Sequence, residues 1–356
     1  MTTKRLRVLY FGTYERDYPR NAQVISCLRK AGVEVGERHA SVWEGQEHKF
    51  SAGPGAAFSL ARAELTLLRR SGADFDALVV GYPGHFDLPA AKHVAQGQPV
   101  VFNPLVSLAD TLVDDRGRFA PRSRVARMLR AIDRAAFRAA DLVVVDTEAN
   151  AALFRELGAR NVRVCLVGAE ERVFTPGWQA QTDFTCLFVG KLIPLHGLET
   201  ILEAAQLAPE LRFRVVGSGQ LESLLQAPPA NVERRVWVDY ERLPDELHHA
   251  GCALGIFGTS AKARRVIPNK VFQALACGTP VVTADTPAAR ELLTDGEGAL
   301  LVPPGDPEAL VAALRRLASD ASLAGRIGAG GLTAYREHAS EAILGARWRT
   351  LIEELL

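Results

Sequence analysis

The sequence lacks several patterns that mark whole classes of protein. Its 356 residues contain no stretch near the roughly 20 apolar residues of a membrane span, so we expect a cytoplasmic protein. The five cysteines are scattered and include no Cys-x-x-Cys pair, which argues against a disulfide framework and a zinc site and predicts buried free thiols. A formal net charge of +1 excludes a global attraction to nucleic acid or anionic lipid.

Two catalytic patterns are also missing. No Gly-x-Gly-x-x-Gly fingerprint follows the first expected strand, which weakens the hypothesis of a nicotinamide-dependent enzyme. No paired carboxylates have the spacing that glycoside hydrolysis needs. One local excess stands out, the basic run Arg116–Arg130. We interpret it as a solvated helix face, with a membrane-docking or acceptor-phosphate patch as the alternative.

Short runs of β-branched residues alternate with helical patterns along the whole chain. Continuous apolar strands of this kind are typical of parallel strands buried on both faces, so we predict doubly wound α/β sheets. The expected strands lie within residues 6–12, 33–39, 77–82, 99–104, 141–147, 162–168, 184–190, 211–219, 232–240, 251–258, 279–285 and 298–304.

The alternation pauses at a polar, turn-rich segment, residues 174–183, and then restarts. We therefore expect two Rossmann-like domains, residues 1–176 and 177–335, that face a central cleft. Residues 336–356 carry apolar residues at helical spacing and are expected to form a helix that packs back toward the N-terminal domain. Ligands should bind at the carboxyl ends of the strands.

Glycine turns and cationic side chains follow the strands of the second half. Glycine lets a backbone approach a ligand closely, and the next helix N-terminus favours an anion. Each turn alone is ordinary turn chemistry, but the series predicts a diphosphate pocket. Its members are Gly190, Lys191, His196, Gly217, Gly219, Thr259, Lys262 and Lys270.

Four segments in the second half carry a resemblance to a known family. "FVGKLIPLHGLETILEAA", "RVVGSGQLESLL", "PNKVFQALACGTPVVTADTPAARELL" and "GALLVPPGDPEALVAAL" together resemble the nucleotide-sugar half of family 4 retaining glycosyltransferases, which have the GT-B fold. The similarity covers about residues 184–314, and it extends more weakly to "YFGTYERDYPRN" in the first half.

The resemblance implies roles for the cations of the pocket. Lys191 matches the basic residue that neutralises the donor diphosphate, and His196 stands where the family usually has a lysine. A histidine still donates a hydrogen bond to phosphate, with a charge that depends on its pKa. Its alternative is a helix-start histidine without a ligand. Lys270 is expected to meet phosphate beside Asn269, after Pro268 in the first turn of a helix.

The family's two glutamates, eight positions apart, are replaced in this chain. Arg265 occupies the position that contacts the donor sugar, and Gln273 occupies the one that binds the ribose. Gln273 retains hydrogen-bonding capacity for ribose hydroxyls. Arg265 reverses the expected charge, which indicates either an acidic or phosphorylated sugar or a side chain that points away.

Further donor contacts follow from the same resemblance. "VWVDYERLPDEL" matches the segment whose backbone pairs with the nucleobase edge, so Val238 and Tyr240 are candidates, whereas Trp237 is expected in the core. Glu291 lies where the family often keeps a glutamate near the end of the pocket, and a helix-cap role is the alternative.

The first half is expected to bind the acceptor. Residues that follow its strands or begin its helices are the candidates for contact, and His85 is the candidate for a catalytic role beside Lys191, His196 and Lys270. Ser107 and Asp110 are also good N-caps, which is their alternative role. The acceptor-binding candidates are Gly12, Thr13, Arg20, Ser107 and Asp110.

The resemblance implies transfer of a sugar from a nucleotide-diphosphate sugar to an acceptor hydroxyl, with retention at the anomeric carbon. The chain shows no Asp-x-Asp triplet of the metal-dependent transferase type, so we expect neither a metal nor a cofactor. The expected partners are the donor and a carbohydrate, lipid-linked or small-molecule acceptor, with no nucleic acid and with peripheral membrane contact left open. The alternatives are a non-catalytic nucleotide-sugar-binding partner subunit and a nucleotide-sugar epimerase.

Overall fold

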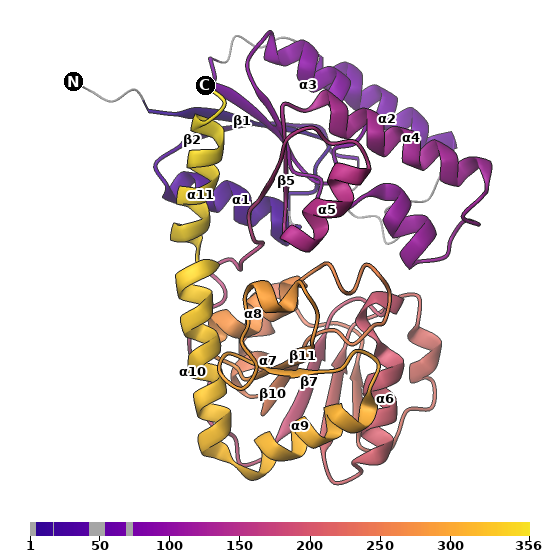
Figure 1. Cartoon of the computed structure of the whole chain (residues 1–356), viewed down its shortest axis with the longest axis vertical. Helices are drawn as coiled ribbons and strands as arrows, with labels where there is room; N and C mark the ends of the chain where they lie inside the picture. The colour runs from indigo at the N-terminus through magenta and orange to yellow at the C-terminus, as the bar shows by residue number, and fades with distance from the viewer. Residues whose placement is uncertain (1–4, 17, 43–53, 69–73) are drawn as a thin grey trace. The chain divides into compact units, whose positions relative to one another are not determined.

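The computed structural model of the chain describes residues 5–16, 18–42, 54–68 and 74–356. These residues form two compact units (Figure 1). The first unit comprises Met1–Leu166 together with Glu341–Leu356, and the second comprises Val167–Ser340. Each unit is built around its own parallel sheet of six strands.

The division between the units falls ten residues earlier than the sequence suggested. The segment between Leu166 and Gly177 already bonds to the second unit, because His248 Nε2 lies 2.8 Å from the Thr175 carbonyl oxygen. The return to the first unit falls after Ser340, because the Tyr335 hydroxyl still donates to the Ala169 carbonyl at 3.3 Å.

The first sheet has the strand order β2-β1-β3-β4-β5-β6, and each neighbouring pair is parallel. Its order reverses between β1 and β3, which makes the carboxyl ends of these two strands the expected place for a ligand. Its strands are β1 Arg7–Gly12, β2 Glu34–His39, β3 Ala77–Val80, β4 Val100–Phe102, β5 Leu142–Val145 and β6 Val162–Val164.

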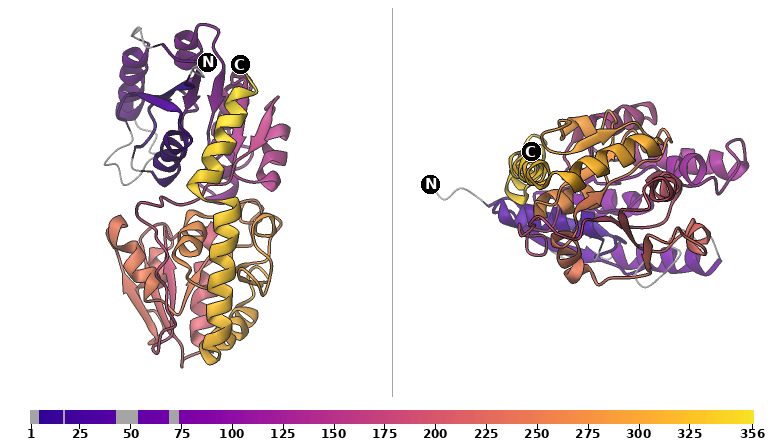
Figure 2. Two further views of the ribbon diagram at one scale, coloured as in Figure 1. Left: turned by 90° about the vertical axis from the view of Figure 1, so that its left-hand side faces the viewer. Right: turned by 90° about the horizontal axis from the view of Figure 1, so that it is seen from below.

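Helices cover both faces of the first sheet. Leu67, Ala91, Phe137 and Phe154 pack on one face, so α2, α3, α4 and α5 share that layer (Figures 1 and 2). The other face is covered by α1 and α11, whose Trp348 is fully buried. The helical segments are α1 Pro19–Lys30, α2 Pro54–Leu67, α3 Leu88–Ala95, the π-helical η1 Asp110–Asp115, α4 Arg124–Ala139, α5 Glu148–Glu156 and α11 Glu341–Glu353.

The second sheet has the order β12-β11-β10-β7-β8-β9, and it is also parallel throughout. The strand order reverses between β7 and β10, so the turns after these strands lie at a topological switch point. Its strands are β7 Thr185–Val189, β8 Arg212–Val216, β9 Val232–Arg235, β10 Cys252–Leu254, β11 Val281–Ala284 and β12 Leu300–Val302. All twelve strands of the two sheets lie within the ranges predicted from the sequence.

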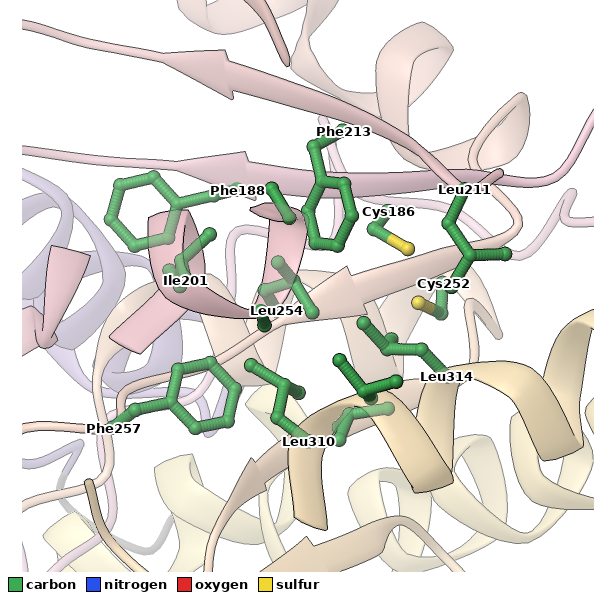
Figure 3. Packing of buried hydrophobic residues seen from close by; sticks show 14 of the residues in the cluster. Cys186, Phe188, Ile201, Leu211, Phe213, Cys252, Leu254, Phe257, Leu310 and Leu314 are labelled. Atoms are coloured by element: carbon green, nitrogen blue, oxygen red, sulfur yellow. The ribbon is translucent and has the colours of Figure 1, made fainter. Parts of the chain in front are cut away.

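The core of the second unit lies between this sheet and the helices α6 and α9 (Figure 3). Phe188, Phe213 and Phe257 are buried there beside Cys186 and Cys252. All five cysteines of the chain are buried and free, which confirms the sequence prediction. The helical segments are η2 Pro194–His196, α6 Leu198–Leu207, η3 Glu222–Leu225, η4 Tyr240–Arg242, α7 Leu243–His248, α8 Asn269–Cys277, η5 Ala289–Glu291, α9 Pro307–Ser319 and α10 Ala321–His338.

Candidate functional site

The glycine turns after β7 and β8 approach each other backbone to backbone. Gly190, Gly217 and Gly219 have φ angles of +149°, +145° and +149°, a region that side-chain-bearing residues rarely adopt. A Cβ atom on Gly217 would lie 1.9 Å from the Gly190 carbonyl oxygen, and one on Gly219 would lie 2.8 Å from the Leu192 oxygen. The glycines are therefore required by the local packing as well as by the backbone angles.

Two of the predicted cationic residues converge on the first of these turns. A Cβ on Gly190 would lie 2.8 Å from Lys270 Nζ and 3.4 Å from His196 Cε1. Both side chains also contact the ring of Phe188. Lys270 Nζ lies 3.5 Å from its centroid, and the His196 ring meets it edge-on at 5.6 Å. The structure thus brings Gly190, His196 and Lys270 together, with Gly217 and Gly219 alongside.

Lys270 is a buried cation without a hydrogen-bond acceptor in the part of the chain that the structure describes. Burial lowers its pKa well below the ordinary value, because the charged ammonium loses its hydration. The face of Phe188 offers only a partial electrostatic substitute for water. An anion beside Nζ would satisfy the ammonium and raise its pKa again, so the arrangement suits an anionic ligand.

His196 is held in one tautomer by the turn that contains Lys191. Its Nδ1 lies 2.5 Å from the Lys191 carbonyl oxygen, which accepts only, so Nδ1 carries the proton. Nε2 is then an acceptor when the ring is neutral and a donor when the ring is protonated. Lys191 itself is exposed and directly follows the Gly190 turn.

The segment after β10 packs against the start of α6. A Cβ on Gly258 would lie 2.4 Å from the Leu195 carbonyl oxygen, which draws this loop onto the turn that carries His196. Farther along the loop, Thr259 is exposed and Lys262 is buried. The half-buried Arg265 donates its backbone N–H to the Lys262 carbonyl at 2.9 Å.

Helix α8 begins one residue later than the sequence suggested. Pro268 is its N-cap, with an extended ψ of 152°, and Asn269 is the first helical residue. The ring has no N–H to lose at this position, so Pro268 ends the loop and Asn269 opens the helix. Behind them, Val271, Phe272 and Leu275 are buried, which confirms the predicted core face.

A second cluster contains two of the predicted residues, Tyr240 and Gln273, together with Glu170. The Tyr240 hydroxyl is buried, and burial is the main cause that raises its pKa, with the neighbouring Glu170 charge adding to the effect. Gln273 is buried and lowers that pKa by hydrogen bonding. Glu170 was missed in the sequence. The available signal was the acidic pair Glu170-Glu171, which follows the predicted strand range 162–168.

Three other predictions in the second unit have mixed outcomes. Trp237 is 75% exposed, so its placement in the core was wrong. The reason is that β9 ends at Arg235 and leaves Trp237 beyond the last paired residue. Val238 is half-buried in the same loop. Glu291 is exposed and closes the short helix η5, whose first turn is capped instead by the Thr286 hydroxyl, which accepts from the Ala289 N–H at 3.0 Å.

In the first unit, the turn after β1 is fastened by a buried carboxylate. The Thr13 N–H donates to Asp87 Oδ2 at 2.6 Å, and a Cβ on Gly12 would lie 2.1 Å from the same oxygen. Gly12 has a φ of +124°. Thr13, His85 and Asp87 line one small cavity at the carboxyl ends of β1 and β3. This is the switch point of the first sheet.

A second carboxyl group, that of Glu64 in α2, lies beside the Asp87 carboxyl. Burial and the hydrogen bond and charge of Asp87 raise the pKa of Glu64 to about 9, and burial raises that of Asp87. One proton shared by the pair satisfies both groups. Asp87 was not predicted, although it follows a strand in the "GYPGHFD" segment, as the predicted His85 does.

His85 and Ser107 meet at one buried carboxylate. His85 Nε2 lies 3.3 Å from Asp133 Oδ1, and the Ser107 hydroxyl donates to Asp133 Oδ2 at 2.7 Å. Burial alone would raise the pKa of Asp133, but the hydrogen bond and charge of His85 hold it below the ordinary value. Ser107 Oγ also accepts from the Asp110 N–H at 3.0 Å, which is the capping role foreseen as its alternative.

Arg20 does not face a ligand, contrary to the prediction. Its side chain is fully buried, and its guanidinium donates to Asn103 Oδ1 at 3.0 Å and to the carbonyls of Leu166 and Cys165 at 2.8 and 3.3 Å. The guanidinium carbon also lies 5.7 Å from the Trp348 ring centroid. Its place in the first turn of α1, on the side that faces the sheet, directs the side chain inward.

We expect Arg20→Met to lower the free energy of unfolding by about 2–3 kcal/mol, because buried acceptors lose their donor. Urea denaturation of the purified variant measures this change. The exposed Arg29→Met on the same helix, whose guanidinium pairs with Glu37, is the control and should change stability by about 0.5 kcal/mol or less. A variant with wild-type stability and a raised KM for acceptor would restore the ligand-binding role.

One Asp-x-Asp triplet, Asp74-Phe75-Asp76, was passed over in the sequence. It precedes β3, and both carboxylates pair with Arg7, at 2.5 Å for Asp74 and 3.3 Å for Asp76. The amino end of β3 lies at the edge of the first sheet opposite to the turn at Gly12. Over the ranges that the structure covers, no group of three His, Cys, Asp or Glu side chains is arranged to hold a metal ion.

Comparison with known families assigns both halves of the chain. Residues 6–170 match the model "Glycosyl transferase 4-like domain", and residues 183–320 match "Glycosyl transferases group 1". Among the helices in the described ranges, none has the length and apolarity needed to cross a membrane.

Solved structures with a similar fold cover nearly the whole chain. A sucrose-phosphate synthase from Thermosynechococcus elongatus superposes with a TM-score of 0.76 at 18% identity over 99% of both chains. HepE of Anabaena, solved in complex with UDP-glucose, gives a TM-score of 0.69 at 16% identity over 98% of this chain and 100% of its own. At these identities the likeness establishes the fold.

Curated relatives are more similar in sequence, but several are matched over only about half of their own length. A "Phosphatidyl-myo-inositol mannosyltransferase" of Mycobacterium leprae is 31% identical over 43% of this chain and 42% of its own. A "D-inositol 3-phosphate glycosyltransferase" of Kribbella flavida is 27% identical over 76% and 72%. The chain therefore has the GT-B fold, with a glycosyl transferase 4-like domain in residues 6–170 and a domain of the glycosyl transferases group 1 in residues 183–320.

Proposed function

We propose that the chain is a retaining glycosyltransferase that moves a sugar from a nucleotide-diphosphate sugar to an acceptor hydroxyl. The observation that carries this proposal is Lys270, a buried amino group with no hydrogen-bond acceptor among the described residues, set against the glycine turn at Gly190. The second unit binds the donor, with the diphosphate at this turn. The first unit binds the acceptor near Thr13 and Asp87.

In the proposed reaction the bond between the anomeric carbon and the diphosphate oxygen breaks, and the acceptor oxygen bonds to the same face of that carbon. The acceptor's proton passes to the departing phosphate oxygen. Lys191, protonated His196 and Lys270 stabilise the negative charge that develops on this phosphate. The remaining work is positioning of the two substrates, so neither a metal nor a cofactor is needed.

The comparisons support the substrate classes. HepE was solved with UDP-glucose, and the Kribbella flavida and Mycobacterium leprae relatives are named for transfer to D-inositol 3-phosphate and to phosphatidyl-myo-inositol. A hexose on a nucleoside diphosphate and a polyol, carbohydrate or lipid-linked acceptor are accordingly the first substrates to test. The reaction belongs in the cytoplasm, where nucleotide sugars are made.

The test begins with a thermal-shift screen of nucleotide sugars, because a donor at a hundred times its Kd stabilises the fold by about 2.7 kcal/mol. A donor that binds is then offered with acceptor alcohols in the presence and absence of EDTA. NMR of the product reads the anomeric configuration. A product with inverted anomeric configuration would refute retention. Loss of turnover with EDTA would refute metal independence. Donor binding without transfer to any acceptor would refute the proposal that the chain is an enzyme.

We expect Lys191→Ala to lower kcat/KM about 10- to 100-fold, because one charge-assisted hydrogen bond to the diphosphate is lost. Steady-state kinetics with the identified donor measures the change. Lys92→Ala removes an exposed lysine that pairs with Asp141, and it should leave the kinetics unchanged. Equal kinetics for Lys191→Ala and the wild type would remove Lys191 from the site.

A non-catalytic nucleotide-sugar-binding subunit is the second candidate. It is favoured by Arg265 and Gln273 at the two positions where the family usually carries glutamates. Slow hydrolysis of the bound nucleotide sugar by the purified chain would count against it. An epimerase has weaker support, because no pair of carboxylate and histidine side chains surrounds the described glycine turns. Conversion of one nucleotide sugar into another without acceptor would favour it.

A further inference from the structure

Three helices of the first unit share one layer and present one outer surface. Leu67 of α2, Ala91 of α3 and Phe137 of α4 all enter the core beneath this face of the sheet. Side chains on the opposite side of each helix therefore point away from the sheet. We call this outer surface the α2–α4 face.

Helix α4 contributes a positive stripe to the α2–α4 face. Four exposed arginines recur at positions three, seven and four apart, which places them on one side of the helix. Its one acidic residue, Asp133, is fully buried against His85. In the described ranges, none of the four guanidinium groups has a carboxylate within ion-pair distance. The four are Arg124, Arg127, Arg134 and Arg138.

Helix α2 contributes an apolar stripe. Phe58, Leu65 and Leu68 are 72%, 67% and 36% exposed, and their spacing of seven and three residues places them on one side of the helix. Ala63 and Leu67 are the buried positions of the same helix. Leaving large apolar side chains in water is unfavourable by about 25 cal/mol per Å² of apolar surface, so a stripe of three marks a contact surface.

Acidic side chains at the ends of these helices are engaged in ion pairs: Asp114 lies 3.7 Å from Arg130 of α4, and Asp141 lies 2.9 Å from Lys92 of α3. Glu64, the one acidic residue in the described part of α2, is half-buried beside Asp87. Helix α3 exposes Pro89, Lys92 and His93 and contains no acid. On α4, Met128 is 55% exposed among the arginines. The α2–α4 face is thus positive and apolar at once.

We propose that the α2–α4 face docks on the surface of a bilayer that contains anionic lipid. Arginine side chains would bind the lipid phosphates, while Phe58 and Leu65 enter the boundary between head groups and acyl chains. A hydrated polyanion such as nucleic acid would satisfy the arginines and leave the apolar stripe in water. The bilayer satisfies both sets of residues. This inference concerns binding, and it holds whether or not the chain transfers a sugar.

The experiment is flotation of the full chain with vesicles. Vesicles of phosphatidylcholine with phosphatidylglycerol are compared with vesicles of pure phosphatidylcholine, each at low and high salt. We expect binding to the anionic vesicles, weaker binding at high salt, and little binding to the zwitterionic vesicles. Equal binding to both kinds, or no binding to either, overturns the proposal.

Variants separate the α2–α4 face from general surface charge. Each arginine near an anionic surface contributes about fivefold in partition, so Arg127→Gln with Arg134→Gln should weaken binding roughly 25-fold. Phe58→Ser with Leu65→Ser should weaken it by about tenfold. All four side chains are exposed, so these variants are expected to fold, which circular dichroism checks.

Matched controls come from the second unit. Arg316→Gln with Arg326→Gln makes the same change of charge on exposed positions of α9 and α10, and Leu207→Ser removes a leucine that is 48% exposed. Neither should change vesicle binding. The assignment of vesicle binding to the α2–α4 face would be overturned if these control variants lost as much binding as the variants of that face. Wild-type binding by the variant with Phe58→Ser and Leu65→Ser would also overturn it. So would competition by RNA that is unaffected by the apolar substitutions.

Discussion

Lys270→Met is expected to lower kcat/KM by about 100- to 1,000-fold, the effect of removing one buried group that stabilises transition-state charge. The same variant should be more stable than the wild type by roughly 0.5–2 kcal/mol, because a buried polar group without a hydrogen-bond partner among the described residues is replaced by an apolar side chain of similar length. The methionine side chain would pack against the Phe188 ring, whose centroid lies 3.5 Å from Lys270 Nζ in the wild type. Kinetics and urea denaturation measure the two changes.

The pH dependence of stability gives this prediction a second readout. Burial lowers the pKa of Lys270 below 10.5, so the unfolded chain binds more protons than the folded one at intermediate pH. Without ligand, the free energy of unfolding should therefore rise as the pH rises from the pKa of Lys270 in the folded state toward 10.5. Lys270→Met should remove this contribution to the pH dependence. Binding of a diphosphate should take up protons, which calorimetry in buffers of different ionisation enthalpy detects.

Lys92→Met is the control, since this lysine is exposed and pairs with Asp141. It should change neither the activity nor the proton uptake. If Lys270→Met lowered stability and activity in parallel, the lysine would be a structural residue. Wild-type turnover in that variant would remove the basis of the proposed donor site.

Gly217→Ala is expected to lower the free energy of unfolding by roughly 3–5 kcal/mol and to abolish donor binding, through steric overlap added to backbone strain. The new Cβ would lie 1.9 Å from the Gly190 carbonyl oxygen, at a φ of +145°. Relief of this overlap requires the turns after β7 and β8 to separate, which displaces Gly190 from Lys270. Denaturation curves and nucleotide titration measure both effects.

Two other glycines separate the contributions to this effect. Gly296 has a φ of +77° and open space around it, so Gly296→Ala should cost about 1–2 kcal/mol from the backbone alone. Gly325 lies within α10 with no atom near its Cβ position, so Gly325→Ala should stabilise by about 0.5–1 kcal/mol. Neither should weaken nucleotide binding. A loss for Gly217→Ala no larger than that for Gly296→Ala would show that the turns are not in tight contact.

The strands were predictable because each is a continuous apolar run between turn residues. The same pattern gave the core face of α8, in which Val271, Phe272 and Leu275 are buried. The pattern failed at Trp237, since an aromatic residue after an apolar run resembles a strand continuation. Whether a strand continues depends on its neighbour, and the edge strand β9 is paired only with β8 and only as far as Arg235.

The sequence indicated which residue types could form the site, but it gave little information about the burial and the contacts of each side chain. Lys191, His196 and Lys270 were chosen because cations follow glycine turns, and two of the three converge on Gly190. Arg20 was chosen because it stands at the start of a helix, yet it is buried against backbone carbonyls. Position at a helix start does not reveal which side of the helix faces the sheet.

The sequence by itself determined the two α/β halves, the order of their strands along the chain and the glycine turns, because these depend on periodicity and on backbone freedom within a few residues. Only the tertiary structure decided that Lys270 has no acceptor among the described residues and that Asp87 holds the Thr13 turn. Both depend on segments that are far apart in the chain. Burial and its electrostatic consequences arise only when those segments pack together.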